Sequence, residues 1–215
     1  MEMMLTKRWI LVLLLMALAG DMLAQKLTTL TTLFPQNKTA MVTLTDGRTI
    51  KAPNANIFLK NASLIYFQGS QAKEARMDLV LGVSFDDRSF VNINNRLAYL
   101  VDSIKGNSLY CVETIDMEAY EDYLKNNVNF TYIDLSHDHL DTATTGLDIN
   151  DGVAFPVKRT FYYRLDGKFV QTDPRELNRE LSKNRNRIMR AVSNAHDFNW
   201  MDKECLMNLL DKLSN

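Results

Sequence analysis

The sequence has few cysteines, few histidines and little net charge, and each of these shortages excludes a class of protein. Among 215 residues it has two cysteines and three histidines, and its formal net charge is −1. Two cysteines exclude a disulfide-rich scaffold, because they allow at most one bridge within the chain. The near balance of charge provides no general attraction to nucleic acid or to an acidic membrane, so no nucleic-acid partner is expected.

The chain also lacks an apolar run long enough to span a membrane. Its unbroken apolar stretch, Trp9–Ala19, ends well short of the roughly 20 residues that a span requires. Two basic residues, Lys7 and Arg8, precede the stretch and small residues follow it, which is the layout of a cleavable secretory signal. We expect cleavage after Ala19 or Ala24, a periplasmic or secreted protein, and no transmembrane anchor after processing.

The two cysteines, Cys111 and Cys205, both follow the predicted signal and allow two interpretations. In an oxidising compartment they could form one disulfide, which would stabilise the fold by about 2–4 kcal/mol. Alternatively, each is a small buried apolar side chain, Cys111 in a strand and Cys205 near a helix face. The sequence leaves both open.

The first half of the mature chain has the pattern of short strands and tight turns. Asp46-Gly47 and Lys105–Asn107 each separate two apolar stretches and are suited to hairpin turns. Leu79, Leu81, Val83 and Phe85 repeat with period two, which predicts a half-buried strand with these four side chains on one face. We therefore predict an antiparallel β unit, a small barrel or roll.

The second half changes to helical spacing. Asp116 is a suitable N-cap for a helix ending near Asn127, and Asp173 caps a second one that begins with proline. The last helix has a leucine face that must pack on something: Leu206, Leu209, Leu210 and Leu213. The predicted fold class is α+β, with these segments: 1–24 signal peptide, 25–38 linker, 39–115 β-rich unit, and 116–215 α+β segment whose C-terminal helices pack on the β unit.

Two resemblances accompany these patterns. The hairpin Val42–Ile50 resembles the first hairpin of Sm-like and other SH3-like small barrels, but the second Sm motif has no counterpart, so an RNA partner is not implied. The signal ending Leu23–Gln25, the motif Phe161–Val170 and the leucine-rich helical tail together resemble uncharacterised exported proteins of Gram-negative gut-type bacteria. This second resemblance implies export and brings no activity or site residue with it.

A histidine-rich segment is the strongest catalytic motif in the sequence. His137, His139 and Asp141 resemble the H-x-H-x-D-H motif of metallo-β-lactamase-type hydrolases, in which these residues bind zinc. Thr142 stands where the final histidine belongs, and His196 is the one remaining imidazole. We therefore predict no metal and no cofactor, and keep a metal-dependent hydrolase centred on this segment as the alternative.

The preferred functional prediction is an exported, non-enzymatic binding or cell-envelope module. Its partner would be an envelope protein, a polysaccharide or a peptide, bound through the β surface or the terminal helix. Two residue sets could form binding surfaces, although their ordinary roles are a solvated helix face and a β core. The first is a basic stripe on a continuous helix, Arg175, Arg179, Lys183, Arg187 and Arg190, and the second is aromatic, Tyr66, Phe67, Tyr99, Tyr162 and Tyr163.

Overall fold

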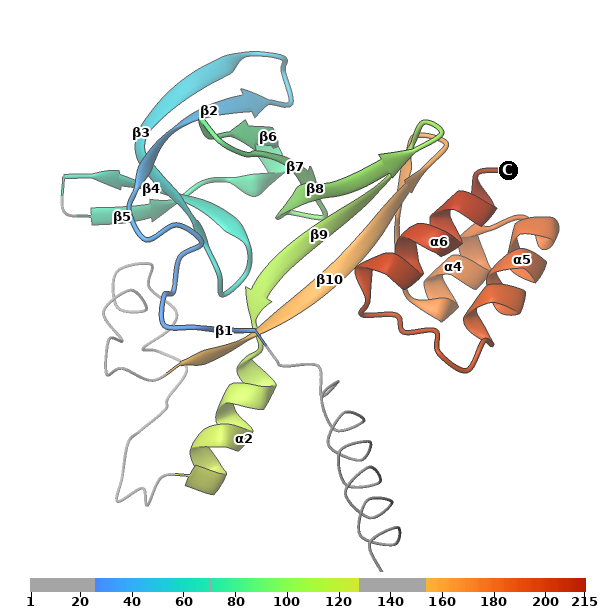
Figure 1. Ribbon diagram of the computed structural model, residues 1–215. Helices are drawn as coiled ribbons and strands as arrows, with labels where there is room; N and C mark the ends of the chain where they lie inside the picture. The colour runs from blue at the N-terminus through green and yellow to red at the C-terminus, as the bar shows by residue number, and fades with distance from the viewer. Residues whose placement is uncertain (1–25, 70, 128–153) are drawn as a thin grey trace, which may run out of the picture.

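A computed structural model describes residues 26–69, 71–127 and 154–215 (Figure 1). The described residues form one large antiparallel sheet and four α-helices. The strands are β1 (Leu27–Thr28), β2 (Lys38–Leu44), β3 (Thr49–Phe58), β4 (Ser63–Gln68), β5 (Gln71–Glu74), β6 (Val80–Ser84), β7 (Ser89–Ile93), β8 (Arg96–Ile104), β9 (Asn107–Ile115), β10 (Phe155–Leu165) and β11 (Lys168–Gln171). The helices are α2 (Met117–Asn127), α4 (Pro174–Glu180), α5 (Lys183–Ser193) and α6 (Lys203–Leu213).

The sheet is a curled half-barrel with one extended arm. Its strand order is β1-β10-β9-β8-β7-β6-β2-β3-β4-β5, and β11 pairs with β10 beside this path. Strands β2 to β7 form the curled part, and the long strands β8 to β10 form the arm (Figure 1). Two-residue turns with positive φ close three hairpins, Asn94-Asn95, Lys105-Gly106 and Asp166-Gly167, which is the conformation that matches strand twist.

The predicted α+β class is wrong, because the protein is mostly antiparallel β. Beyond residue 116 the sequence predicts a hairpin of Phe161–Leu165 and Lys168–Val170, which forms, but its first strand β10 begins at Phe155 and has eleven residues. Strand β10 pairs with β9 from Val157 opposite Ile115 to Arg164 opposite Ser108, so the sheet continues across the expected boundary. Tyr162 and Tyr163 are both buried. With both faces covered, β10 has no clear alternation that would reveal its full length.

The C-terminal helices pack on the arm of the sheet, as predicted for the terminal leucine face. Leu206, Leu209 and Leu210 have no exposed surface, and they share a core with Cys111 and Tyr163. The Tyr163 hydroxyl also donates a 2.7 Å hydrogen bond to the Leu206 carbonyl, which links β10 to α6. No helix in the described part of the chain is long and apolar enough to cross a membrane.

The helical segment after Asp173 is broken beside Ser182–Asn184, where the sequence leaves a break open, and so is not the continuous helix on which the basic stripe depends. The Asp173 carboxylate accepts hydrogen bonds from the backbone N–H groups of Arg175 (2.8 Å) and Glu176 (3.2 Å), and so begins α4. Helix α4 ends at Glu180, and Ser182 caps α5. The basic residues predicted to form one stripe therefore belong to two separate helices.

The segment 26–38, predicted as a linker, is held against the sheet. Strand β1 pairs with the start of β10, at Leu27 opposite Pro156 and Thr28 opposite Phe155. Further on, the buried Asn56 amide accepts a hydrogen bond from the Phe34 N–H (3.1 Å) and donates one to the Phe34 carbonyl (3.0 Å). Pairing and side-chain hydrogen bonds thus fix this segment.

A β-bulge changes which residues of β6 face the core. Val42 lies opposite Val83, whereas Leu44 lies opposite Val80, so Leu81 is an extra residue in the ladder. Val80 and Val83 are consequently both buried. The predicted common face of Leu79, Leu81, Val83 and Phe85 is wrong, because Leu79 and Leu81 are 44% and 52% exposed.

Candidate binding groove

A groove opens in the half-barrel where β3 separates from β4. Strand β3 pairs with β2 from Thr49 to Ala52 and again at Ala55, opposite Lys38, and it pairs with β4 from Ala55 onward. Asn54 lies between these two stretches with a φ of 54°, a left-handed conformation that asparagine tolerates better than most residues. The first half of β3 therefore has no strand partner on its second edge among the described residues.

The groove is apolar and continuous with the core beneath it. Its volume is about 690 Å³. Buried Val42, Leu64 and Val80 form its floor and belong to the core of the half-barrel, while Ile50 and Leu79 line it with 47% and 44% of their surface exposed. Its lining residues are Val42, Leu44, Ile50, Lys51, Ala52, Pro53, Leu64, Tyr66, Phe67, Gln68, Ala75, Arg76, Leu79 and Val80.

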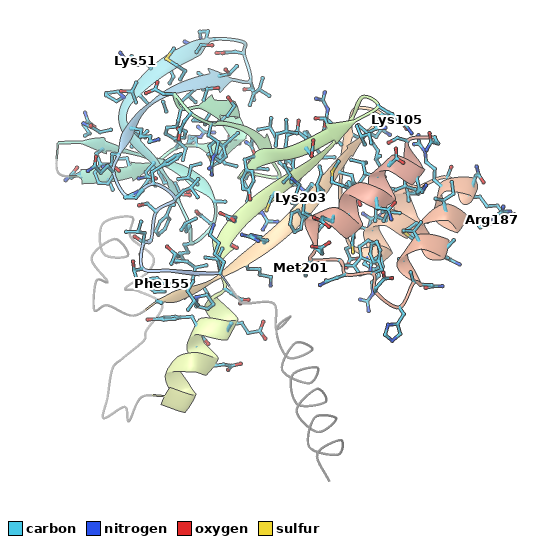
Figure 2. All side chains as sticks on the ribbon, viewed as in Figure 1. Lys51, Lys105, Phe155, Arg187, Met201 and Lys203 are labelled. Atoms are coloured by element: carbon cyan, nitrogen blue, oxygen red, sulfur yellow. The ribbon has the colours of Figure 1, made fainter. Side chains whose placement is uncertain are left out.

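Few polar groups face this groove. Arg76 is already paired with Asp78, at 2.8 Å. Lys51 lies opposite Met41 in the ladder, on the outer face of the sheet, and Figure 2 shows it at the outer rim of the half-barrel. The Arg48 carbonyl accepts a hydrogen bond from the Leu44 N–H of β2. Successive residues of an antiparallel strand direct their N–H and C=O groups to opposite edges, so the backbone groups of Lys51 point to the edge of β3 that faces away from β2. The groove thus offers apolar side chains and a short stretch of backbone.

The lining contains no histidine, cysteine, serine, aspartate or glutamate. These residue types supply most general acids, bases and nucleophiles in enzymes. The lining does include Lys51 and Tyr66, so its composition is mainly apolar with few titratable side chains.

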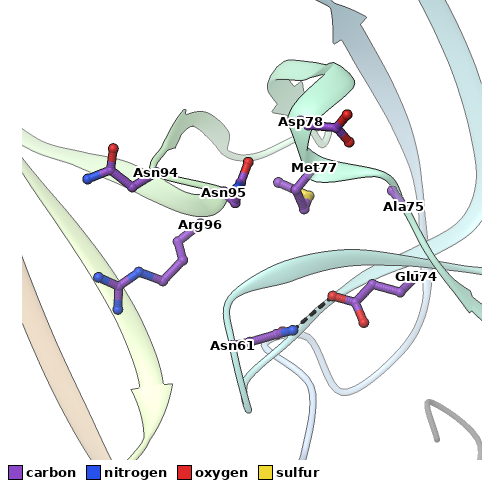
Figure 3. A pocket seen from close by; sticks show the side chains of 8 residues that line it. All are labelled: Asn61, Glu74, Ala75, Met77, Asp78, Asn94, Asn95 and Arg96. Carbon is purple, nitrogen blue, oxygen red and sulfur yellow. Dashed lines mark hydrogen bonds between the residues drawn. The ribbon is translucent and has the colours of Figure 1, made fainter. Parts of the chain in front are cut away.

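A second, polar pocket of about 400 Å³ lies between the β3–β4 turn and the β7–β8 turn (Figure 3). Asn61 and Glu74 face one another across its lower side and share a 2.8 Å hydrogen bond, while Arg96 extends away from them. The Arg96 guanidinium donates to the Tyr162 hydroxyl at 2.6 Å. These polar groups are engaged with protein partners, so the pocket is a weaker candidate.

The most buried charge among the described residues is Glu113, on β9, whose side chain is 6% exposed. Its carboxylate accepts two hydrogen bonds from Lys26 Nζ (2.9 and 2.8 Å) and one from Arg159 Nε (3.0 Å). Burial disfavours the ionised form, but the bonds and charges of Lys26 and Arg159 outweigh it and hold the pKa of Glu113 below its usual value. Two cations satisfy this carboxylate, so it anchors the N-terminal segment to the sheet.

The two cysteines, Cys111 and Cys205, are free in the structure. The Cys111 thiol is buried beside the Val112 carbonyl, whereas the half-buried Cys205 thiol contacts the Asp197 carbonyl 3.8 Å away. Burial raises the pKa of Cys111 to about 11. Its thiol is therefore protonated at neutral pH and is not an activated nucleophile.

The other residues singled out in the sequence do not assemble into one site. His137, His139, Asp141 and Thr142 lie outside the described residues, and His196 is exposed. In the ranges 26–69, 71–127 and 154–215, no group of three or more potential metal ligands occurs. Of the aromatic set, Tyr162 and Tyr163 are buried in the sheet, whereas Tyr66 and Phe67 line the groove.

Comparison of the chain with known protein families, with curated proteins and with solved structures gave no match. The groove and the Glu113 cluster were both missed by sequence reasoning. A glutamate within the apolar stretch Leu109–Ile115 was a signal for the cluster, because a charge in a buried strand needs a partner. Pro53-Asn54 inside β3 was a signal for the groove, because proline within a strand favours an edge.

Proposed function

We propose that the protein is an exported, non-enzymatic binding module that holds a small apolar ligand in the groove of its half-barrel. The observation that carries this proposal is a concave, solvent-open surface whose floor is the core itself and whose walls include the exposed Ile50 and Leu79. Small-molecule sites typically have volumes of roughly 300–1,000 Å³, mainly apolar walls and a few polar groups. The lining of this groove has that composition.

The same features favour an apolar ligand over the polysaccharide considered from the sequence. Sugar recognition commonly uses exposed aromatic faces together with several hydrogen-bonding side chains. Here Tyr162 is 2% exposed and Tyr163 has no exposed surface, so these two rings cannot serve as a platform, and Tyr66 and Phe67 line the groove among mainly apolar side chains with few hydrogen-bonding groups. An apolar ligand in the groove would instead remove Ile50 and Leu79 from water, with a gain of about 25 cal/mol for each Å² buried.

The test is a titration with N-phenyl-1-naphthylamine, an uncharged probe that fluoresces in apolar surroundings. The native protein should bind it saturably, and Leu79→Ser should weaken binding several-fold because Leu79 lines the groove. Leu81→Ser is the matched control, since Leu81 is similarly exposed but does not line the groove. Equal affinity in the two variants, or no saturable binding by the native protein, would contradict the proposal.

A second pair of variants tests whether the effect of Leu79→Ser on probe binding comes from the groove itself rather than from a local change in structure at Leu79. Ile50 lines the groove and is 47% exposed, whereas Met41 on the neighbouring strand is 44% exposed and lies outside it. Ile50→Ser should weaken the probe as Leu79→Ser does, and Met41→Ser should bind like the native protein. All four residues are about half exposed, so each substitution should leave the fold intact.

A further inference from the structure

We propose that a pocket between α4 and α5 binds a phosphate group. The pocket has a volume of about 510 Å³. Its lining residues belong to α4 and α5, which lie away from the curled part of the sheet (Figure 1). Five residues line it, and three of them are cationic: Asn178, Lys183, Asn186, Arg187 and Arg190. The lining contains no acidic residue, so the pocket concentrates positive charge.

The three cations come from one face of α5. Lys183, Arg187 and Arg190 stand at positions i, i+4 and i+7, and so project from successive turns on the same side. Lys183 and Arg187 form no ion pair among the described residues, and Arg190 donates a 2.6 Å hydrogen bond to the Asn178 Oδ1 atom. Figure 2 shows Arg187 at the outer surface of the helical pack. Like charges at this spacing repel, and an anion between them would relieve that repulsion.

Two arginines near the pocket, Arg179 and Arg185, are neutralised by carboxylates, unlike the cations that line it. Arg179 is paired with Glu176 and Glu180, and Arg185 is paired with Asp166. The carboxylates of Glu176, Glu180 and Asp166 are thus paired with arginines that do not line the pocket. Because α4 and α5 are separate helices, the pocket cations are set apart from Arg179, and the positive charge remains at the pocket.

The fold also fixes the shape of the pocket. The Asn186 Nδ2 group donates hydrogen bonds to the carbonyls of Asn178 (2.9 Å) and Leu181 (3.0 Å), which hold the end of α4 against α5. Asn178 in turn positions the guanidinium of Arg190. The packing of α4 against α5 and the position of Arg190 are therefore set before any ligand binds, and the exposed side chains of Lys183 and Arg187 remain to be ordered on binding.

Phosphate is the anion that this set of groups recognises best. A guanidinium presents two parallel N–H donors that match two phosphate oxygens, and a lysine adds a compact positive charge. The phosphate could belong to a free phosphate or phosphomonoester, or to a lipid headgroup, and the chemistry of recognition is the same.

The test compares the melting temperature of the protein in sodium phosphate and in sodium chloride at equal ionic strength. Phosphate should raise the melting temperature of the native protein. Arg187→Gln should weaken phosphate binding by about tenfold, the effect of losing one charge-assisted pair, and should largely remove the rise. Arg175→Gln is the control, because Arg175 is an exposed arginine of α4 that does not line the pocket.

Vesicles distinguish the two sources of phosphate. Co-sedimentation with phosphatidylglycerol but not with phosphatidylcholine vesicles, lost in Arg187→Gln, would assign the site to a lipid headgroup. A phosphate-dependent rise in melting temperature without co-sedimentation would assign it to a free phosphate or phosphomonoester. If neither phosphate nor phosphatidylglycerol is bound, or if Arg187→Gln and Arg175→Gln behave alike, the proposal is overturned. These outcomes are independent of the groove, because neither arginine lines it.

Discussion

Replacing Lys26 by methionine tests whether the buried Glu113 anchors the N-terminal segment. Methionine keeps much of the length of lysine but cannot donate the two hydrogen bonds, of 2.9 and 2.8 Å, to the Glu113 carboxylate. Arg159 would still hold one oxygen through its 3.0 Å contact. The Glu113 carboxylate would therefore lose one of its two cations and keep the other.

The geometry sets the magnitude of the effect. A hydrogen bond to a charged group contributes about 1.5–3 kcal/mol, and water can partly replace Lys26 because its side chain is 47% exposed. We expect Lys26→Met to lower the free energy of unfolding by about 1–2 kcal/mol. Removing Arg159 as well would leave the buried Glu113 carboxylate without a cation and with only the 3.5 Å hydrogen bond from the Tyr99 hydroxyl, at a cost of about 3–5 kcal/mol. The double variant should thus lose more than the sum of the two single ones.

The assay is urea unfolding at neutral pH in a double-mutant cycle with Glu113→Gln. Without the carboxylate, Lys26→Met should cost little. If Lys26→Met costs the same in the Glu113→Gln background as in the native protein, the anchoring interpretation is refuted.

The pH dependence of unfolding gives a second readout of the same cluster. The folded-state pKa of Glu113 is lowered, so its stabilisation is present above the ordinary carboxyl value of 4.5 and is lost as the pH falls through the folded-state pKa. Glu113→Gln should remove this part of the acid-induced loss of stability.

Two further predictions concern the ends of the chain. Leu209→Ala should destabilise the protein by about 2–5 kcal/mol, because Leu209 has no exposed surface, and an unchanged urea midpoint would contradict its place in the core. Mass spectrometry of the exported protein should show an N-terminus near Gly20 or Gln25, as the predicted signal peptide requires, and an intact Met1 in exported material would contradict export by cleavage.

Local elements were predictable from the sequence because their signals are local. Asp46-Gly47 and Lys105-Gly106 both form the predicted hairpin turns, and Asp173 caps the predicted helix. The leucine face of α6 is buried as its spacing indicates. In each case a few neighbouring residues contain the whole signal, so no knowledge of distant contacts was needed.

The fold class and the groove depend on contacts between distant segments. The pairing of β10 with β9 joins residues on either side of 128–153, and burial on both faces hides the strand period in Tyr162 and Tyr163. The bulge at Leu81 shifts the inward face of β6 by one residue, which no alternation rule detects. The groove follows from where β3 leaves β4, a property of sheet pairing rather than of any motif.

The most direct test of the binding proposal is a methyl NMR titration of the isoleucine- and leucine-labelled protein with N-phenyl-1-naphthylamine. We predict that the methyl signals of Ile50, Leu64 and Leu79, which line the groove, shift with a common dissociation constant. Those of Leu81, outside the groove, and Leu209, in the helical core, should stay in place. Shifts centred on Leu209, or no shift at any methyl group as the probe is added, would contradict a binding site in the half-barrel.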